Sequence, residues 1–155
     1  MVTEIRKILL AEDNPNDVEL TLAALRQNHL ANEVVVARDG AEALDYLYRR
    51  GAFAARPGGN PALILLDLKM PKVDGIDVLR QAKSDPALKT IPIVVLTSSR
   101  EEQDVVKSYD FGVNAYVVKP VDFPEFVQAV RVLGGFWAVL NEPPPARGGP
   151  VELPR

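Results

Sequence analysis

The sequence predicts an α/β domain in which a parallel sheet is covered by helices, and two observations support this. Short runs of β-branched and other aliphatic residues recur along the chain, and near-continuous apolar runs of this length suit strands buried on both faces. The stretches between them have the apolar spacing of amphipathic helices. Five strand–helix pairs in alternation indicate a doubly wound domain with right-handed crossovers. The five predicted strands are Ile5–Ala11, Glu33–Ala37, Ala62–Leu66, Ile91–Leu96 and Ala115–Val118.

The first predicted helix has a well-marked start and one apolar face. Asn14 is a suitable cap, Pro15 occupies the first helical position, and Asp17 follows in the first turn. The apolar stripe of this helix comprises Val18, Leu22 and Leu25, and that of a later helix comprises Ile76, Leu79 and Ala82.

Composition limits the class of protein. The 155 residues include 18 basic and 21 acidic side chains, 47% are hydrophobic, and there is no cysteine. This composition is typical of a soluble globular domain, and its mild acidity argues against nucleic-acid binding. The absence of cysteine excludes disulfides and thiolate zinc sites. The apolar run near the N-terminus is too short for a signal peptide or a membrane span, so we expect a cytoplasmic protein that contacts no membrane.

Two segments do not fit the alternating pattern. Gly51–Pro61 contains three glycines and two prolines and is predicted to form an extended surface loop. Residues 141–155 contain five prolines, which favour extended chain over helix. We therefore expect one domain over residues 1–140 followed by a proline-rich tail over residues 141–155.

Three acidic residues stand at the ends of predicted strands. Glu12 and Asp13 follow the first strand, and Asp67 follows the third. In an open parallel sheet, ligands bind at the carboxyl ends of the strands, so these carboxylates converge if the two strands are neighbours. Converging carboxylates repel one another, and a hard divalent cation such as Mg²⁺ or Mn²⁺ would neutralise them. The alternative is that Glu12 and Asp13 only cap the first helix.

Two further strand ends carry complementary groups. Thr97 and Ser98 follow the fourth strand, and Lys119 follows the fifth. A hydroxyl and an ammonium beside a metal-bound carboxylate suit an incoming phosphoryl group, whose oxygens need donors and positive charge. Singly, each of these residues would be an ordinary strand terminus.

Taken together, these motifs resemble the receiver domain of bacterial response regulators. Thr97 lies 30 residues after Asp67, and Lys119 lies 22 residues after Thr97, both usual spacings for that family. The longer interval from Asp13 to Asp67 is explained by the loop described above. The resemblance covers roughly residues 6–140 and rests on Leu9–Asn14, Leu65–Pro71 with Asp74-Gly75, Val95–Ser98 and Tyr116–Pro120.

The resemblance implies a flavodoxin-like fold with strand order 2-1-3-4-5 and a role for each site residue. Asp67 would accept a phosphoryl group from the phosphohistidine of a sensor histidine kinase. Glu12, Asp13, Asp67 and the backbone carbonyl of Lys69 would hold Mg²⁺. Lys119 would pair with the phosphoryl oxygens, and its bond to Pro120 would be cis.

The resemblance also implies a switch. Thr97 would turn its hydroxyl onto the phosphoryl group, and Tyr116 would move inward into the vacated space. The periodicity of the strand alone favours Tyr116 as an ordinary half-exposed residue, and it is the resemblance that favours the switch. Gly75 would begin the third helix close to the site, where a side chain would be least welcome.

In the C-terminal region, Gly135-Phe136-Trp137 is followed by Leu140 and by the run Pro143–Pro145. With this segment the chain most resembles receivers paired with bacterial phytochromes. In that subgroup Phe136, Trp137 and the tail would anchor a homodimer; the alternative is a helix that packs on its own sheet. The residues after Leu140 are too few for an output domain, which implies a stand-alone receiver that is not an enzyme.

The sequence argues against three other classes of function. A haloacid-dehalogenase-type phosphohydrolase would need a second aspartate where Lys69 stands. A nucleotide or flavin binder would show a glycine-rich loop after the first strand, which this chain lacks. A pseudo-receiver, which works without phosphorylation, would lack one of the five key side chains, and this chain has all of them. His29, the single histidine, is predicted to be exposed and not a phosphodonor.

Overall fold

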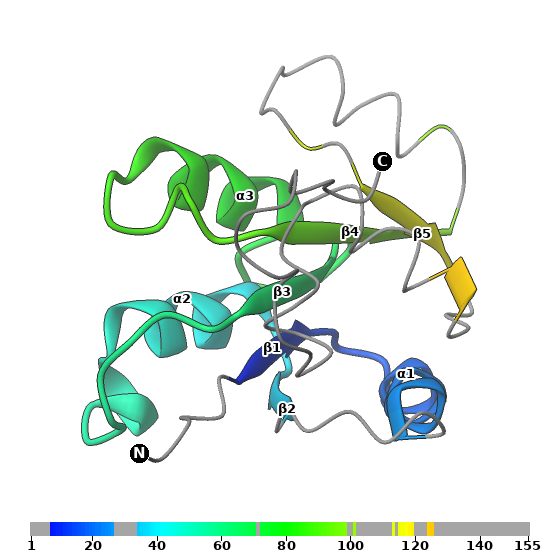
Figure 1. The fold of residues 1–155 in the computed structure, drawn as a ribbon, viewed down its shortest axis with the longest axis horizontal. Helices are drawn as coiled ribbons and strands as arrows, with labels where there is room; N and C mark the ends of the chain where they lie inside the picture. The colour runs from blue at the N-terminus through cyan, green and yellow to red at the C-terminus, as the bar shows by residue number, and fades with distance from the viewer. Residues whose placement is uncertain are drawn as a thin grey trace, which may run out of the picture.

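The computed structural model describes residues 7–26, 34–70, 72–98, 101, 113, 115–119 and 124–125. Over residues 8–97 strands and helices alternate as predicted, and Figure 1 shows their arrangement. The helices predicted after the fourth and fifth strands lie almost entirely outside the described residues. The elements are β1 (Ile8–Ala11), α1 (Pro15–Arg26), β2 (Val34–Ala37), α2 (Gly40–Tyr48), the 3-10 turn η1 (Gly51–Phe53), β3 (Leu63–Asp67), α3 (Gly75–Ser84), β4 (Ile93–Thr97) and β5 (Tyr116–Val118).

The five strands form one parallel sheet of order β2-β1-β3-β4-β5, which confirms the predicted order. In the ladder between β1 and β3, Ala11 lies opposite Leu66. Asp67 lies opposite Leu96, and Thr97 lies opposite Val118. The last residues of these strands therefore form one edge of the sheet.

Helices cover both faces of the sheet (Figure 1). On one face, Leu9, Ile64 and Val95 belong to a core cluster with residues of α2 and α3. On the other, neighbouring strand residues cluster with Val18 and Leu25 of α1. Because both faces are buried, β1, β3 and β4 consist entirely of buried residues. This explains why their sequences are continuous apolar runs without a polar alternation.

Strand boundaries differ from the prediction by one to three residues. β3 and β4 each extend one residue further, so Asp67 and Thr97 are the last residues of strands and not the first residues of loops. Ile91, predicted as strand, belongs to a turn in which its backbone N–H donates to the carbonyl of Leu88 at 3.0 Å. Pro92 has no N–H to donate, and the strand begins after it.

The predicted loop Gly51–Pro61 is exposed over most of its length but more ordered than expected. It begins with the short turn η1, whose Phe53 ring meets the Tyr46 ring edge-on with centroids 5.1 Å apart. The Arg56 guanidinium lies 4.1 Å from the centroid of the Tyr46 ring and donates to the Tyr46 carbonyl at 2.7 Å. These contacts with α2 fix the loop, and nothing in local sequence propensity indicates them.

Several predictions concern residues outside the described part of the chain. These are the dimer anchors Phe136 and Trp137, the tail over residues 141–155, the cis bond to Pro120 and the exposure of His29. They stay predictions.

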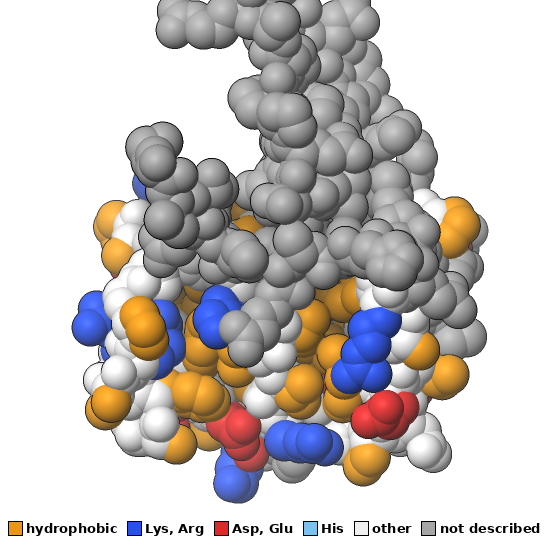
Figure 2. Space-filling view, turned by 60° about the horizontal axis from the view of Figure 1, so that its bottom comes forward, with side chains coloured by type: hydrophobic (Ala, Val, Ile, Leu, Met, Phe, Trp, Pro, Cys, Tyr) orange, Lys and Arg blue, Asp and Glu red, His pale blue; other side chains and the backbone are white. Residues whose placement is uncertain are grey.

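The surface in Figure 2 shows one face of the described residues. Hydrophobic side chains lie across its middle, and acidic and basic side chains lie beside one another along its lower edge. Such a mixture is ordinary for a protein surface. Within the described ranges, each helix is too short or too polar to cross a membrane.

Candidate functional site

Three carboxylates converge where β1 and β3 end. Glu12 and Asp13 directly follow β1, and Asp67 ends the neighbouring strand β3. One oxygen of each lies within 4.8 Å of the other two. Glu12 is fully buried and Asp67 is 4% exposed, whereas Asp13 is open to solvent. Carboxylate oxygens are the ligands that hard divalent cations prefer, so this group fits such an ion.

The electrostatics of these carboxylates also favour a cation. Burial and the charge of Asp67 raise the pKa of Glu12 to about 7, although Lys119 acts in the opposite direction. Burial likewise raises the pKa of Asp67, against the charge of Lys119. Without a cation, this pair therefore retains a proton near neutral pH. A divalent ion would displace that proton and favour the charged form of both groups.

Lys119 provides a positive charge beside these acids. Its backbone N–H donates to the Thr97 carbonyl at 2.8 Å, which fixes the residue at the end of β5. Its ammonium nitrogen Nζ lies 3.2 Å from Oδ1 of Asp67 and 3.2 Å from Oε1 of Glu12. The side chain is 15% exposed, so the charge is only partly screened by water. An ammonium in this position can pair with the oxygens of an anionic ligand at the end of β3.

Thr97 contributes a hydroxyl at the end of β4, which lies between β3 and β5. The residue is fully buried, and its Oγ1 has no hydrogen-bond partner among the described residues. A buried hydroxyl without a partner costs about 1–3 kcal/mol. A ligand with acceptor oxygens at the ends of β3 and β4 would provide that partner. Ser98, which follows Thr97, is exposed.

Tyr116 is the first residue of β5 and is half-buried. Its ring packs against the core cluster of α2 and α3, and its hydroxyl donates to the carbonyl of Val113 at 3.3 Å. This position is that of an ordinary strand residue in the present conformation, and its movement in a switch stays a prediction.

Gly75 brings the start of α3 against the backbone of Asp67. Its N–H donates to the Leu68 carbonyl at 2.9 Å. A Cβ at this position would overlap the carbonyl oxygen of Asp67 and the Cα of Leu68. The prediction that a side chain is unwelcome at this position is confirmed, and the reason is backbone contact with the acidic residue itself.

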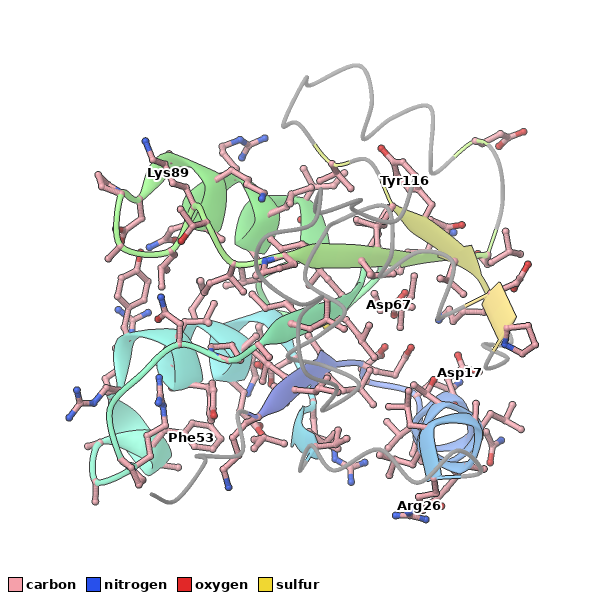
Figure 3. The ribbon with its side chains drawn as sticks, in the orientation of Figure 1. Asp17, Arg26, Phe53, Asp67, Lys89 and Tyr116 are labelled. Atoms are coloured by element: carbon pink, nitrogen blue, oxygen red, sulfur yellow. The ribbon has the colours of Figure 1, made fainter. Side chains whose placement is uncertain are left out.

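One residue of the site was missed by the sequence analysis as a functional residue. Asp17, predicted only as a first-turn acid of α1, accepts a hydrogen bond from Nζ of Lys119 at 3.0 Å. In Figure 3, Asp17 and Asp67 lie toward the same end of the sheet, whereas Phe53 and Lys89 lie at the opposite end. The first turn of α1 follows β1 closely, which is the signal that places Asp17 at this edge.

The strand order, with acidic groups at the carboxyl edge, is that of a doubly wound domain that binds its ligands at this edge. Comparison with protein families makes the assignment specific. Residues 8–131 match the family model described as the response regulator receiver domain, and the chain belongs to this family. Members of this family act in two-component signalling, bind divalent metal and interact with histidine kinases.

Individual relatives agree with this assignment. The response regulator Rcp1 of Synechocystis is 40% identical over 130 residues, which are 84% of this chain and 87% of that protein. The solved structure of the bacteriophytochrome response regulator AtBRR is 64% identical with a TM-score of 0.86, and the match covers 90% of this chain and all of that one. A Mn²⁺-bound form of Rcp1 is 38% identical with a TM-score of 0.69, covering 91% and 99% of the two chains. The chain is therefore related to response regulators that are associated with phytochromes.

Proposed function

We propose that this protein accepts a phosphoryl group on Asp67 from a sensor histidine kinase, in a reaction that depends on Mg²⁺. The observation that carries the proposal is the surroundings of the Asp67 carboxylate. It is buried beside two further acids, its Oδ1 lies 3.2 Å from the Lys119 ammonium, and the neighbouring strand ends in the buried hydroxyl of Thr97, which has no partner within the described residues. This combination provides an acceptor together with donors for the oxygens of the transferred group.

In the proposed reaction, a carboxylate oxygen of Asp67 attacks phosphorus and forms a new P–O bond. The P–N bond to the kinase histidine breaks, and its electron pair remains on the imidazole nitrogen. Lys119 then pairs with one phosphoryl oxygen, and the Thr97 hydroxyl donates to another. Because phosphoryl transfer needs little covalent help, holding these groups in place is the main contribution of the protein.

Glu12, Asp13, Asp67 and the backbone carbonyl of Lys69 would hold the metal ion. A bound Mg²⁺ supplies charge neutralisation between the attacking carboxylate and the phosphoryl oxygens. Mn²⁺ has similar ligand preferences and would occupy the same group. The support is the convergence of three carboxylates and the raised pKa values, which a divalent cation would relieve.

The switch that we propose begins at Thr97. When its hydroxyl turns to the phosphoryl group, the space beside β4 becomes available to Tyr116, which lies on the adjacent strand opposite Val95. The new position of the tyrosine ring would change the surface that a partner binds. On this account the protein signals through its surface and performs no catalytic turnover of its own.

The kinase partner that we propose is a bacteriophytochrome, which implies a cytoplasmic location. The support is the 64% identity to two response regulators described as bacteriophytochrome regulators.

We also propose, from the sequence of the C-terminal region, a homodimer anchored by Phe136 and Trp137. Light scattering on the full chain and on a Phe136→Ala/Trp137→Ala variant tests the dimer; a wild-type monomer at micromolar concentration would refute it.

The acceptor is tested by measuring the mass of the intact protein after incubation with Mg²⁺ and acetyl phosphate. We expect one phosphoryl adduct on the wild type and none on Asp67→Asn. Asp45→Asn, which removes a half-buried acid of α2 that pairs with Arg50, is the matched control and should be phosphorylated like the wild type. An adduct on Asp67→Asn at the wild-type level would refute the assignment of Asp67, and an undiminished reaction after metal chelation would refute the role of Mg²⁺.

The partner is tested by phosphotransfer from an autophosphorylated bacteriophytochrome. At equal concentrations, we expect phosphotransfer to this protein to be faster from the bacteriophytochrome than from a histidine kinase without a phytochrome module. Equal rates from both kinases would count against a phytochrome partner and leave the acceptor assignment intact.

A further inference from the structure

The ammonium of Lys119 has more acidic partners than the proposed reaction requires. Its Nζ contacts Oδ1 of Asp67 and Oε1 of Glu12, each at 3.2 Å, and Oδ2 of Asp17 at 3.0 Å. An ammonium group has three N–H donors, so each can be directed to a different carboxylate. Glu12 and Asp67 belong to the group that converges on the candidate metal site, and Asp17 does not. Asp17 is therefore a partner of the lysine from outside the metal site.

The position of Asp17 is fixed by its own helix. Its backbone N–H donates to Oδ1 of Asn14 at 3.1 Å, as does the N–H of Asn16 at 2.9 Å, so the first turn of α1 is capped. A carboxylate in the first turn is stabilised by the N-terminal end of the helix dipole. The side chain is 29% exposed, whereas Glu12 is fully buried. Asp17 thus holds a negative charge on the solvent side of Lys119.

Two ligands of the site make opposite demands on this lysine. A divalent cation among Glu12, Asp13 and Asp67 competes with the ammonium for the same carboxylate oxygens, and the two positive charges repel. A phosphoryl group on Asp67, in contrast, needs an N–H of the ammonium for one of its oxygens. A carboxylate that draws the ammonium toward α1 assists the first ligand and competes with the second.

We propose that Asp17 is a positioning residue that draws the Lys119 ammonium toward α1, and thereby strengthens cation binding and weakens the hold of the site on a phosphoryl group. This inference rests on the proposed function, because it concerns the same lysine and the same ligands. It assigns to a residue of α1 a part in setting the balance between the unphosphorylated and phosphorylated forms.

The charge state of the lysine agrees with this assignment. Burial alone would lower the pKa of Lys119, but the hydrogen bond to Asp17 and the charges of Asp67 and Glu12 outweigh burial and raise it. The lysine is therefore charged at any pH at which the protein works, and its hydrogen bond to Asp17 is charge-assisted.

The test compares Asp17→Asn with the wild type and with Glu19→Gln. Glu19 is an exposed acid of the same helix, so Glu19→Gln removes one negative charge without touching Lys119. Dissociation constants are measured by calorimetry, first for Mg²⁺ alone and then for beryllofluoride, a tetrahedral stand-in for the phosphoryl group, at saturating Mg²⁺. In Asp17→Asn we expect Mg²⁺ affinity to fall about three- to fivefold and beryllofluoride affinity to rise by about the same factor, as for one partly exposed ion pair. Glu19→Gln should change the affinity for Mg²⁺ and the affinity for beryllofluoride by no more than about half of the factor expected for Asp17→Asn.

Opposite signs for the two ligands distinguish positioning from general damage. A fall in both affinities would show a structural role and overturn the inference, as would changes no larger than those of Glu19→Gln. The Lys119→Met background supplies a second test, in which the effect of Asp17→Asn on Mg²⁺ affinity should shrink to that of Glu19→Gln. An undiminished effect there would mean that Asp17 acts on the cation directly, which also overturns it. A wild type that binds neither ligand would instead refute the proposed function.

Discussion

The raised pKa of Glu12 makes the stability of the metal-free protein depend on pH. Its pKa rises from the ordinary value of 4.5 to about 7 in the folded chain. Between these two values the unfolded chain has released the proton and the folded chain still holds it, so the free energy of unfolding falls as pH rises through this window. At about 1.4 kcal/mol for each tenfold change in proton affinity, the loss due to Glu12 is about 3 kcal/mol. This loss of stability is absent well below pH 4.5 and complete above about pH 7.

The assay is urea unfolding across this pH window in the presence of a chelator. In Glu12→Gln the group cannot titrate, so the difference between wild type and variant reports Glu12 together with the two groups coupled to it, Asp67 and Lys119. We expect this difference to change by about 3 kcal/mol from the acid end to the neutral end, with the wild type losing stability. Saturating Mg²⁺ should remove most of the dependence, because the cation replaces the proton. A difference that stays constant across the window, without metal, would refute the electrostatic account of the site.

Three further predictions concern single side chains. Gly75→Ala should lower the free energy of unfolding by about 1–3 kcal/mol, because the new Cβ displaces the backbone of Asp67. The same displacement should slow the reaction with acetyl phosphate. Gly58→Ala is the control in urea unfolding, because the atom nearest to its new Cβ belongs to the flexible end of Arg49. Thr97→Val should raise the free energy of unfolding by about 1 kcal/mol, since it removes a buried hydroxyl that has no partner in the described part of the chain, and should weaken beryllofluoride binding measured by calorimetry. Tyr48→Phe should destabilise the protein by about 1 kcal/mol in the same unfolding assay, through loss of its 2.7 Å hydrogen bond to Asp85, and should leave phosphorylation unchanged.

Most of the fold could be predicted because strands that are buried on both faces of a sheet have continuous apolar sequences. Strands such as β3 and β4 are continuous apolar runs up to their last residue, and the helices that the structure describes do not have that pattern. Their exact ends were less predictable. The end of β4 depends on where Thr97 finds a ladder partner in β5, and its start depends on the missing N–H of Pro92.

The candidate site was predictable as far as topology determines it. Once β1 and β3 are neighbours, the residues after Ala11 and Leu66 must meet, so the grouping of Glu12, Asp13 and Asp67 follows from strand order. The contact between Asp17 and Lys119 was not predictable in this way. The two residues are 102 positions apart, and their contact depends on the direction in which the first turn of α1 presents a side chain. The packing of Phe53 and Arg56 on Tyr46 was missed for the same reason.

Among the residues that the structure describes, the carboxyl edge of the sheet holds two groups that the fold leaves unsatisfied. Glu12 holds a proton there that it would release in water, and the buried Thr97 hydroxyl has no partner among those residues. Both conditions disfavour the ligand-free state, and both are relieved by the ligands that the proposed function requires, a divalent cation and a phosphoryl group. Ligands that bind only the folded chain stabilise it, so the stability sacrificed at this edge is recovered when the site is filled. The same groups that weaken the empty domain are therefore the ones that the proposed function would use at the carboxyl edge.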